Sequence, residues 1–207
     1  MDVGSVILAG GKGSRMGGAD KAFVNLAGKP LIAHVLARLT PQVADLVTSA
    51  NGDLSRFRSL GLPAVADSIG GFAGPLAGLL AGLEWHAEYR PDIPYVACVP
   101  TDTPFFPSDL VARLLAEAER EQRPVVARSQ SGAHPVIGLW PVATAHALRD
   151  ALDAGIRKVG AWTELQATAE VAFPATEIGG KTVDPFFNIN RPADLAMAET
   201  LLRARTP

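Results

Sequence analysis

The sequence predicts an α/β protein with a three-layer α/β/α fold built around a mostly parallel sheet. Apolar runs of about five residues alternate with longer helix-like segments along the chain, and this alternation is typical of a parallel sheet covered by helices. Hydrophobic residues make up 48% of the chain and charged residues 19%, a composition too apolar for a disordered protein. At roughly 150 residues per domain, the 207 residues predict a single domain, 1–207.

The expected elements follow one another in this order. Seven apolar runs are predicted as strands: 3–9, 46–49, 64–66, 95–99, 125–127, 136–140 and 170–173. Six segments with helical spacing are predicted as helices: 31–39, 54–60, 76–89, 108–121, 142–154 and 193–203. Pro30 and Pro75 each precede one of these helices, where the N–H group that proline lacks would have no partner within the helix. Asp53 precedes a third, where its side chain can cap the first turn. From about residue 129 the pattern is less regular, so this part is expected to extend one end of the sheet.

Charge, cysteine content and hydropathy exclude several classes of protein. The formal net charge is −2, so no overall field attracts nucleic acid or an anionic membrane. Cys98 is the only cysteine, which excludes an internal disulfide and a cysteine-only metal site. We identify no targeting segment, and the longest uncharged stretch, 68–83, is shorter than the ~18 residues of a spanning helix. We therefore expect a cytoplasmic protein with no nucleic-acid or membrane partner.

A glycine-rich loop follows the first predicted strand. Residues 10–21 contain five glycines, three cations and one acid. Glycine lets backbone N–H groups turn around an anion, and Lys or Arg supplies the charge that a phosphate chain requires. No GxxxxGK[ST] motif fits the loop, and Met16 takes the place of the third glycine of a dinucleotide fingerprint. The loop therefore predicts a phosphate site of another kind, with a plain surface loop as the alternative.

Asp102 is the leading candidate for a metal ligand. It follows the apolar strand 95–99, at the carboxyl edge of the sheet where ligands of open α/β folds bind. A carboxylate there suits Mg²⁺, which prefers oxygen ligands and bridges phosphates. The alternative is that Asp102 only organises the turn between Pro100 and Pro104. Thr101-Asp102-Thr103 lacks the D-x-D pattern usual in metal-dependent sugar transferases, so sugar transfer is disfavoured.

Several motifs together resemble one family. Leu8-Ala9-Gly10-Gly11, Arg15-Met16-Gly17-Gly18 and Asp20-Lys21 are similar to the start of the MobA family of molybdenum cofactor guanylyltransferases. Further motifs of the same family follow in order along the chain: Ser49-Ala50-Asn51, Ala66-Asp67-Ser68, Gly74-Pro75-Leu76-Ala77-Gly78, Val99-Pro100-Thr101-Asp102-Thr103-Pro104, His134-Pro135 and Asn188-Ile189-Asn190. The resemblance spans nearly the whole chain and implies the Rossmann-like nucleotidyltransferase fold of the nucleotide-diphospho-sugar-transferase type. Arg191 departs from the pattern, since the family commonly has Thr there.

This resemblance implies an activity. It is the transfer of GMP from GTP to the terminal phosphate of molybdopterin or molybdenum-molybdopterin, which gives molybdopterin guanine dinucleotide and pyrophosphate. Residues 1–128 would bind the nucleotide and 129–207 the acceptor, with Mg²⁺, or alternatively Mn²⁺, as cofactor and other molybdenum cofactor biosynthesis proteins as possible partners. Gly10 favours the guanylyl branch, because relatives that use CTP tend to have alanine there. The alternatives are another nucleotidyltransferase of this fold, forming a cytidylyl pterin or an NDP-sugar, and a nucleotide-binding regulator without turnover.

The candidate site residues have distinct expected roles. Arg15, Lys21 and Asp102 are the predicted catalytic residues, because the two cations can neutralise charge on the leaving pyrophosphate; Lys12 is a weaker candidate. In the family pattern, Asn51 and Asp67 lie at the guanosine, and Asp67 could accept hydrogen bonds from the ribose or from guanine. The predicted nucleotide-binding set is Leu8, Ala9, Gly10, Gly11, Gly13, Lys21, Asn51, Asp67, Gly74, Asp102, Asn188 and Asn190. Asp102 and Asn190 are the predicted metal ligands.

Other residues carry weaker expectations. Asn188 and Asn190 alternate, so in an extended segment both side chains point to one face; which of them touches the metal stays open. Gly78 and Gly82 are expected to allow close helix packing, and Gly74 precedes a helix whose free N–H groups could bind a ligand. The histidines show no zinc or nucleophile pattern, although His134 lies in a family motif near the acceptor region. Arg157 and Lys158 add two cations to that later part.

Overall fold

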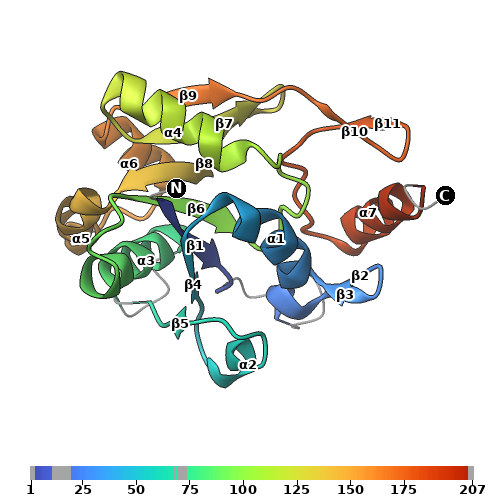
Figure 1. Cartoon of the computed structure of the whole chain (residues 1–207), viewed down its shortest axis with the longest axis horizontal. Helices are drawn as coiled ribbons and strands as arrows, with labels where there is room; N and C mark the ends of the chain where they lie inside the picture. The colour runs from blue at the N-terminus through green and yellow to red at the C-terminus, as the bar shows by residue number, and fades with distance from the viewer. Residues whose placement is uncertain (1–2, 11–19, 68, 70–73, 205–207) are drawn as a thin grey trace.

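A seven-stranded sheet runs through the centre of the protein (Figure 1). The computed structural model describes residues 3–10, 20–67, 69 and 74–204. The sheet has the strand order β5-β4-β1-β6-β8-β7-β9. Its strands are β1 (Val3–Leu8), β4 (Asp45–Ser49), β5 (Ala64–Val65), β6 (Tyr95–Pro100), β7 (Val125–Ser129), β8 (Gly132–Pro141) and β9 (Ala169–Ala172). Two separate hairpins pair β2 (Asn25–Leu26) with β3 (Lys29–Pro30) and β10 (Thr176–Ile178) with β11 (Lys181–Val183).

The helices confirm the predicted alternation with the strands. They are α1 (Leu31–Leu39), α2 (Ser55–Arg58), α3 (Pro75–Tyr89), α4 (Leu110–Glu121), α5 (Ala145–Asp153), α6 (Val159–Leu165) and α7 (Pro192–Arg203). Within the described residues there are also three short 3-10 turns: η2 (Lys21–Phe23), η3 (Thr40–Gln42) and η4 (Val142–Thr144). Of these helices, none is long and apolar enough to cross a lipid bilayer, a finding restricted to the described residues.

The sheet is mostly parallel, with one strand reversed. β5, β4, β1 and β6 run parallel to one another, and β7 runs parallel to β9, whereas β8 is antiparallel to both β6 and β7. Only two residues separate β7 from β8, and so short a connection can join antiparallel strands but not parallel ones. β8 also begins at Gly132, four residues before the predicted start at Val136.

Both faces of the sheet are buried, which explains why its strands read as continuous apolar runs. On one face Ile7 belongs to a buried cluster with α1 and α4, through residues such as Val35 and Leu114. On the other face Val6 belongs to a cluster with α3, α5 and α6. Successive residues of β1 therefore face opposite helix layers, and the carboxyl ends of the parallel strands β1, β4 and β6 lie at a common edge.

Small and large residues alternate between β1 and α3. Gly4 lies against the ring of His86, Val6 lies against Gly82, and Leu8 lies against Gly78. A Cβ added at Gly82 would be 2.4 Å from the Val6 Cβ, so the helix could not approach this closely with any larger residue. The expectation of close packing at Gly78 and Gly82 is confirmed. Burial lowers the pKa of the His86 imidazole, and its Nδ1 pairs with the Gly82 carbonyl oxygen at 2.8 Å.

The later part of the chain differs most from the sequence expectation. The predicted helix 142–154 divides into η4 and α5, and α6 was not predicted. α6 exists because Trp162 is buried and stacks on Trp140 of β8, with 6.0 Å between ring centroids. The two hairpins and α7 share a separate apolar cluster that includes Leu26, Ile178 and Leu201, at the right of Figure 1.

Candidate active site

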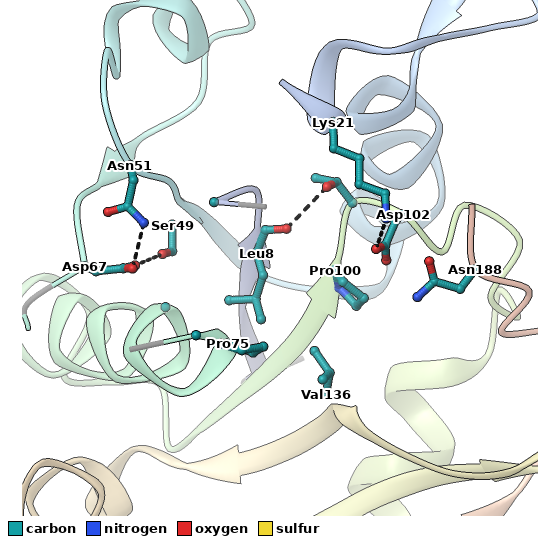
Figure 2. A pocket seen from close by; sticks show the side chains of 14 residues that line it. Leu8, Lys21, Ser49, Asn51, Asp67, Pro75, Pro100, Asp102, Val136 and Asn188 are labelled. Atoms are coloured by element: carbon teal, nitrogen blue, oxygen red, sulfur yellow. Dashed lines mark hydrogen bonds and ion pairs between the residues drawn. The ribbon is translucent and has the colours of Figure 1, made fainter. Parts of the chain in front are cut away.

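A cleft of about 290 Å³ opens at the carboxyl edge of the sheet. Leu8, Ser49 and Pro100, the last residues of β1, β4 and β6, line it together with the start of α3. Ligands of open α/β sheets bind at this edge, because the loops there leave backbone groups unpaired. Figure 2 shows polar side chains at two ends of the cleft, with Leu8 between them. We call these the Asp67 end (Ser49, Asn51 and Asp67) and the Asp102 end (Lys21, Asp102 and Asn188); we include in the Asp102 end Asn190, which contacts Lys21.

At the Asp67 end, two neutral groups hold one carboxylate. The Ser49 hydroxyl donates to Asp67 Oδ1 at 3.0 Å, and the Asn51 amide donates to Oδ2 at 2.8 Å. No described cation pairs with Asp67 in a salt bridge, so its charge remains available for a ligand with N–H or O–H groups. The Arg56 guanidinium stabilises this end by donating a hydrogen bond to the Asn51 carbonyl oxygen at 3.1 Å.

Two glycines make room for this arrangement. A Cβ at Gly10 would lie 3.2 Å from the Asn51 amide nitrogen, and a Cβ at Gly78 would lie 2.8 Å from the Ser49 hydroxyl. The Ser49 side chain therefore fits here because Gly78 lacks a side chain, and a side chain at Gly10 would require the Asn51 amide to shift by a few tenths of an ångström. Ser49 was not among the predicted site residues, although it belongs to a quoted family motif and is the last residue of the predicted strand 46–49.

At the Asp102 end, backbone contacts bring distant segments together. The Thr101 N–H donates to the Leu8 carbonyl oxygen at 3.1 Å, and the Ile189 N–H donates to the Asp102 carbonyl oxygen at 2.8 Å. Ile189 is fully buried, so its neighbours Asn188 and Asn190 lie on the opposite side of an extended segment, as their alternation predicts. Asn188 lines the cleft, whereas Asn190 meets Lys21.

Lys21 lies between two oxygen atoms at this end. Its Nζ donates to Asp102 Oδ2 at 2.6 Å and to Asn190 Oδ1 at 2.5 Å. The Asp102 and Lys21 side chains are only 18% and 12% exposed. A carboxylate and a carboxamide oxygen are the ligand types that a hard divalent cation prefers, and here they already converge on a positive charge. The donor set therefore fits the metal site predicted from Asp102 and Asn190.

That metal site would be sparse in protein ligands. Within the described part of the chain, no group of three or more His, Cys, Asp or Glu residues is arranged to hold a metal. Magnesium is commonly bound in this manner, by one or two carboxylates with water and substrate phosphates filling the remaining positions. The Asp102 end is thus suited to a cation that arrives with a phosphate ligand.

Most of the predicted nucleotide-binding residues lie at this cleft. Those that line it are Leu8, Gly10, Lys21, Asn51, Asp67, Gly74, Asp102 and Asn188. Ala9 differs, because it is 2% exposed and its side chain packs among Ala22, Ile32 and Phe57. Its backbone N–H donates a hydrogen bond to the Ser49 carbonyl oxygen at the edge of the sheet. Gly11, Gly13 and Arg15, and the weaker candidate Lys12, lie outside the described residues.

A second cavity of about 410 Å³ adjoins the cleft. The two share Pro100, Val136 and Asn188. His134 lines the second cavity and packs on Phe186, with 4.7 Å between ring centroids. Arg157, by contrast, donates to the carbonyl oxygens of Leu152 and Ile156 at the end of α5.

A polar network fixes one wall of this second cavity. The Ser129 hydroxyl donates to Asp184 Oδ2 at 2.6 Å, so it accepts the hydrogen bond from His134 Nε2 at 2.8 Å. Burial lowers the pKa of His134, which favours its neutral form at pH 7. Burial alone would raise the pKa of Asp184, but hydrogen bonds from Ser129 and the Phe186 N–H outweigh it and lower that pKa.

Comparisons with known proteins point to one family. A family model described as a MobA-like NTP transferase domain matches residues 5–169. A molybdenum cofactor guanylyltransferase of Rhodopseudomonas palustris (strain BisB5) is 47% identical over 199 residues, 95% of this chain and 92% of that protein. Another, from Bradyrhizobium sp. (strain ORS 278), is 48% identical over 201 residues, 96% of this chain and 92% of that protein.

Solved structures share the fold. Molybdopterin-guanine dinucleotide biosynthesis protein A of Archaeoglobus fulgidus has a TM-score of 0.70 at 24% identity, covering 97% of this chain and 98% of that one. A Mycobacterium tuberculosis H37Rv protein solved in complex with manganese has a TM-score of 0.67 at 15% identity, covering 97% of this chain and 99% of that one. At these identities the likeness concerns the fold alone.

Proposed function

Because this chain belongs to the MobA-like NTP transferase family, we propose that it is a molybdenum cofactor guanylyltransferase. It transfers GMP from GTP to the terminal phosphate of molybdopterin or molybdenum-molybdopterin and releases pyrophosphate. Relatives that share nearly half of its residues over nearly its whole length carry that name. The observation that carries the proposal is the division of the cleft into an end whose carboxylate pairs with no cation of the described residues and an end with a cation between metal-ligand oxygens.

The Asp67 end suits a guanine base. A carboxylate only accepts hydrogen bonds, and the guanine edge presents N1–H and N2–H₂ as donors. Cytosine presents acceptors at the corresponding ring positions, which a carboxylate repels. Ser49 and Asn51 occupy the sides of Asp67 and keep its remaining lone pairs directed into the cleft.

The Asp102 end suits the triphosphate. Asp102 and Asn190, with Asn188 beside them, would hold Mg²⁺ or a similar divalent cation, which would offset the negative charge of the two phosphate-bearing substrates. Lys21 would contact the phosphates, and Gly74 at the start of α3 lines the same cleft. The roles of Arg15, Gly11 and Gly13 in the same task stay predictions.

The reaction does not require the protein to remove a proton from the nucleophile. A phosphate nucleophile is already ionised at neutral pH, so no general base is required. In keeping with this, no His or Cys is found among the described residues that line the cleft. We infer that rate enhancement comes from placing two polyanions together in line and offsetting their repulsion.

The second cavity is the proposed acceptor site. It shares a wall with the cleft, so an acceptor phosphate could reach the nucleotide from it. Phe186 and Phe187 offer flat apolar surfaces there, and Ser131 and His134 offer polar groups. Its residues come mainly from the 129–207 part of the chain, which supports the proposed division into a nucleotide part and an acceptor part of one domain. We expect the reaction in the cytoplasm, together with other proteins of the same pathway.

The direct test offers α-labelled GTP, CTP, ATP and UTP one at a time, with divalent cation and molybdopterin. We expect label in the dinucleotide product from GTP alone, with release of pyrophosphate. Label transferred from CTP would contradict the guanylyl assignment. Binding of GTP without transfer to any pterin acceptor would indicate a nucleotide-binding regulator instead.

A further inference from the structure

Lys21 occupies the point where the predicted metal ligands meet. Asp102 follows β6 and Asn190 precedes α7, yet both direct an oxygen atom at the same ammonium nitrogen, at 2.6 and 2.5 Å. Thr103 Oγ1 donates to the other Asp102 oxygen at 3.3 Å. The Lys21 side chain is 12% exposed, so this is a largely enclosed ion pair and not a solvated surface contact.

A divalent cation and this ammonium group exclude each other. Oxygen atoms that lie about 2.5 Å from a nitrogen need move by only a few tenths of an ångström to reach the roughly 2.0 to 2.2 Å distances of Mg²⁺ or Mn²⁺ ligands. Two cations at one point would repel strongly, because the enclosed site screens them poorly. Binding of the metal to Asp102 therefore requires Lys21 to leave.

The backbone at Lys21 is fixed, so the movement is confined to the side chain. Asp20 Oδ1 accepts a hydrogen bond from the Ala22 N–H at 3.1 Å, and the Val24 N–H donates to the Lys21 carbonyl oxygen at 3.2 Å. Arg56 forms an ion pair with Asp20 and holds the same turn. The lysine side chain has four flexible carbons and itself lines the cleft, so its ammonium group can exchange Asp102 for a phosphate without a backbone change.

We propose that Lys21 is a built-in counter-ion that keeps the divalent-cation site closed until a nucleotide arrives. This inference rests on the proposed function, because the nucleotide's phosphates are the anion that receives Lys21. Without a polyanion, metal binding would expel Lys21 from Asp102 with no new partner. With a triphosphate present, the metal takes Asp102 and Asn190 while Lys21 moves to the phosphates, so the two ligands bind together far better than the metal alone.

The proposal predicts that removing the charge of Lys21 raises the affinity for the metal alone and lowers the affinity for GTP with Mg²⁺. Lys21→Met keeps the length and apolar stem of the side chain but removes its charge. We expect the variant to bind Mn²⁺ alone about tenfold more tightly than the parent protein, because the metal no longer competes with the ammonium group. The same variant should bind GTP with Mg²⁺ about tenfold more weakly, because the phosphates lose a cation; a factor of ten corresponds to about 1.4 kcal/mol.

The experiment titrates MnCl₂ into the full chain without nucleotide and follows free Mn²⁺ by electron paramagnetic resonance. Lys29→Met is the matched control, because Lys29 lies in the hairpin strand β3 and does not line the cleft. Its Mn²⁺ affinity should equal that of the parent protein. Asp102→Asn should lose Mn²⁺ binding. The rise in melting temperature on adding Mn²⁺, measured within each variant, should be largest for Lys21→Met and controls for any change in its basal stability.

Two results would overturn the proposal. One is Mn²⁺ binding to Lys21→Met that is equal to or weaker than binding to the parent protein, and the other is the same gain in Lys29→Met. These outcomes are separate from failure of the proposed function, which concerns the nucleotide and the acceptor. If the parent protein transfers no GMP to molybdopterin while Lys21→Met still gains Mn²⁺ affinity, the counter-ion role stands and the substrate assignment falls.

Discussion

The two ends of the cleft hold their carboxylates in different ways. Asp67 is held by two neutral donors, Ser49 and Asn51, which pack closely against Gly78 of α3 and Gly10 after β1. Asp102 is held by the ammonium group of a long, flexible side chain. The comparison indicates that base recognition is preorganised, whereas the phosphate end must rearrange before it can act. Variants that affect one end and not the other can test this division.

Loss of the Asp102 carboxylate should have the largest effect. Asp102→Ala removes the candidate metal ligand and should lower GMP transfer by about 10³-fold, a loss typical of removing a central electrostatic group. The fold should be kept, because Asp102 lies in a loop and not within a strand. Turnover assays with GTP and pterin, together with circular dichroism, measure both quantities. Unchanged turnover would contradict the metal-binding role of this end.

A change in the charge of Asp67 should affect the choice of base. Asp67→Asn keeps the shape but places an N–H₂ group where guanine also donates, so kcat/KM for GTP should fall by about 100-fold. The affinity for CTP, measured as its inhibition of GTP turnover, should not fall in parallel. Competition between GTP and CTP in one assay measures the ratio of the two affinities. An unaltered ratio would place the guanine base away from Asp67.

Two glycines on α3 provide a matched pair. Gly78→Ala and Gly82→Ala each introduce a methyl group into a tight contact with β1, at 2.8 and 2.4 Å from the nearest atoms, and each should cost about 1–3 kcal/mol of stability. Only Gly78 contacts Ser49, so only Gly78→Ala should also raise the KM for GTP, by about tenfold. Denaturant unfolding and steady-state kinetics separate the two effects. Equal kinetics for both variants would argue against a preorganised Asp67 end.

Removal of the Ser49 hydroxyl should have the smallest effect. Ser49→Ala deletes one of the two hydrogen bonds that hold the Asp67 carboxylate, so kcat/KM for GTP should fall by about fivefold, which corresponds to about 1 kcal/mol. Inosine triphosphate, which lacks the N2 amino group, should be affected less than GTP. Ser59→Ala is the control, because the Ser59 hydroxyl bonds to Arg56 on the exposed side of α2 and does not line the cleft. A similar loss in the control variant would exclude a positioning role for Ser49.

The sequence was sufficient for most of the fold because the decisive signals are local. β1, β4 and β6 are buried on both faces, so their apolar runs could be recognised directly, and their ends predicted where ligand residues would gather. The start of β8 was predicted at Val136 and not at Gly132, because Gly132 and Pro135 are residues typical of turns. The pairing of β8 with β7 also shifts register between Val126 and Ala127. α6 was missed because a short helix held by the packing of Trp162 on Trp140 leaves little local pattern.

Contacts within the site were harder to predict than its position. Lys21 and Asp102 are 81 residues apart, and Lys21 and Asn190 are 169 apart, so no local rule states that one ammonium group joins both. Ser49 was missed because its role arises from space left by Gly78 on another element. Arg191 stands where the family commonly has Thr, but α7 can begin without that threonine. Asp194 accepts hydrogen bonds from the N–H groups of Asn190 and Arg191 and so caps the start of the helix.

The most direct test is a crystal structure of the chain with a non-hydrolysable GTP analogue and Mn²⁺. We expect the guanine edge on Asp67, an anomalous manganese peak between Asp102 and Asn190, and the Lys21 ammonium group on the triphosphate. A base bound elsewhere, or manganese bound away from Asp102 with Lys21 still paired to it, would contradict the account.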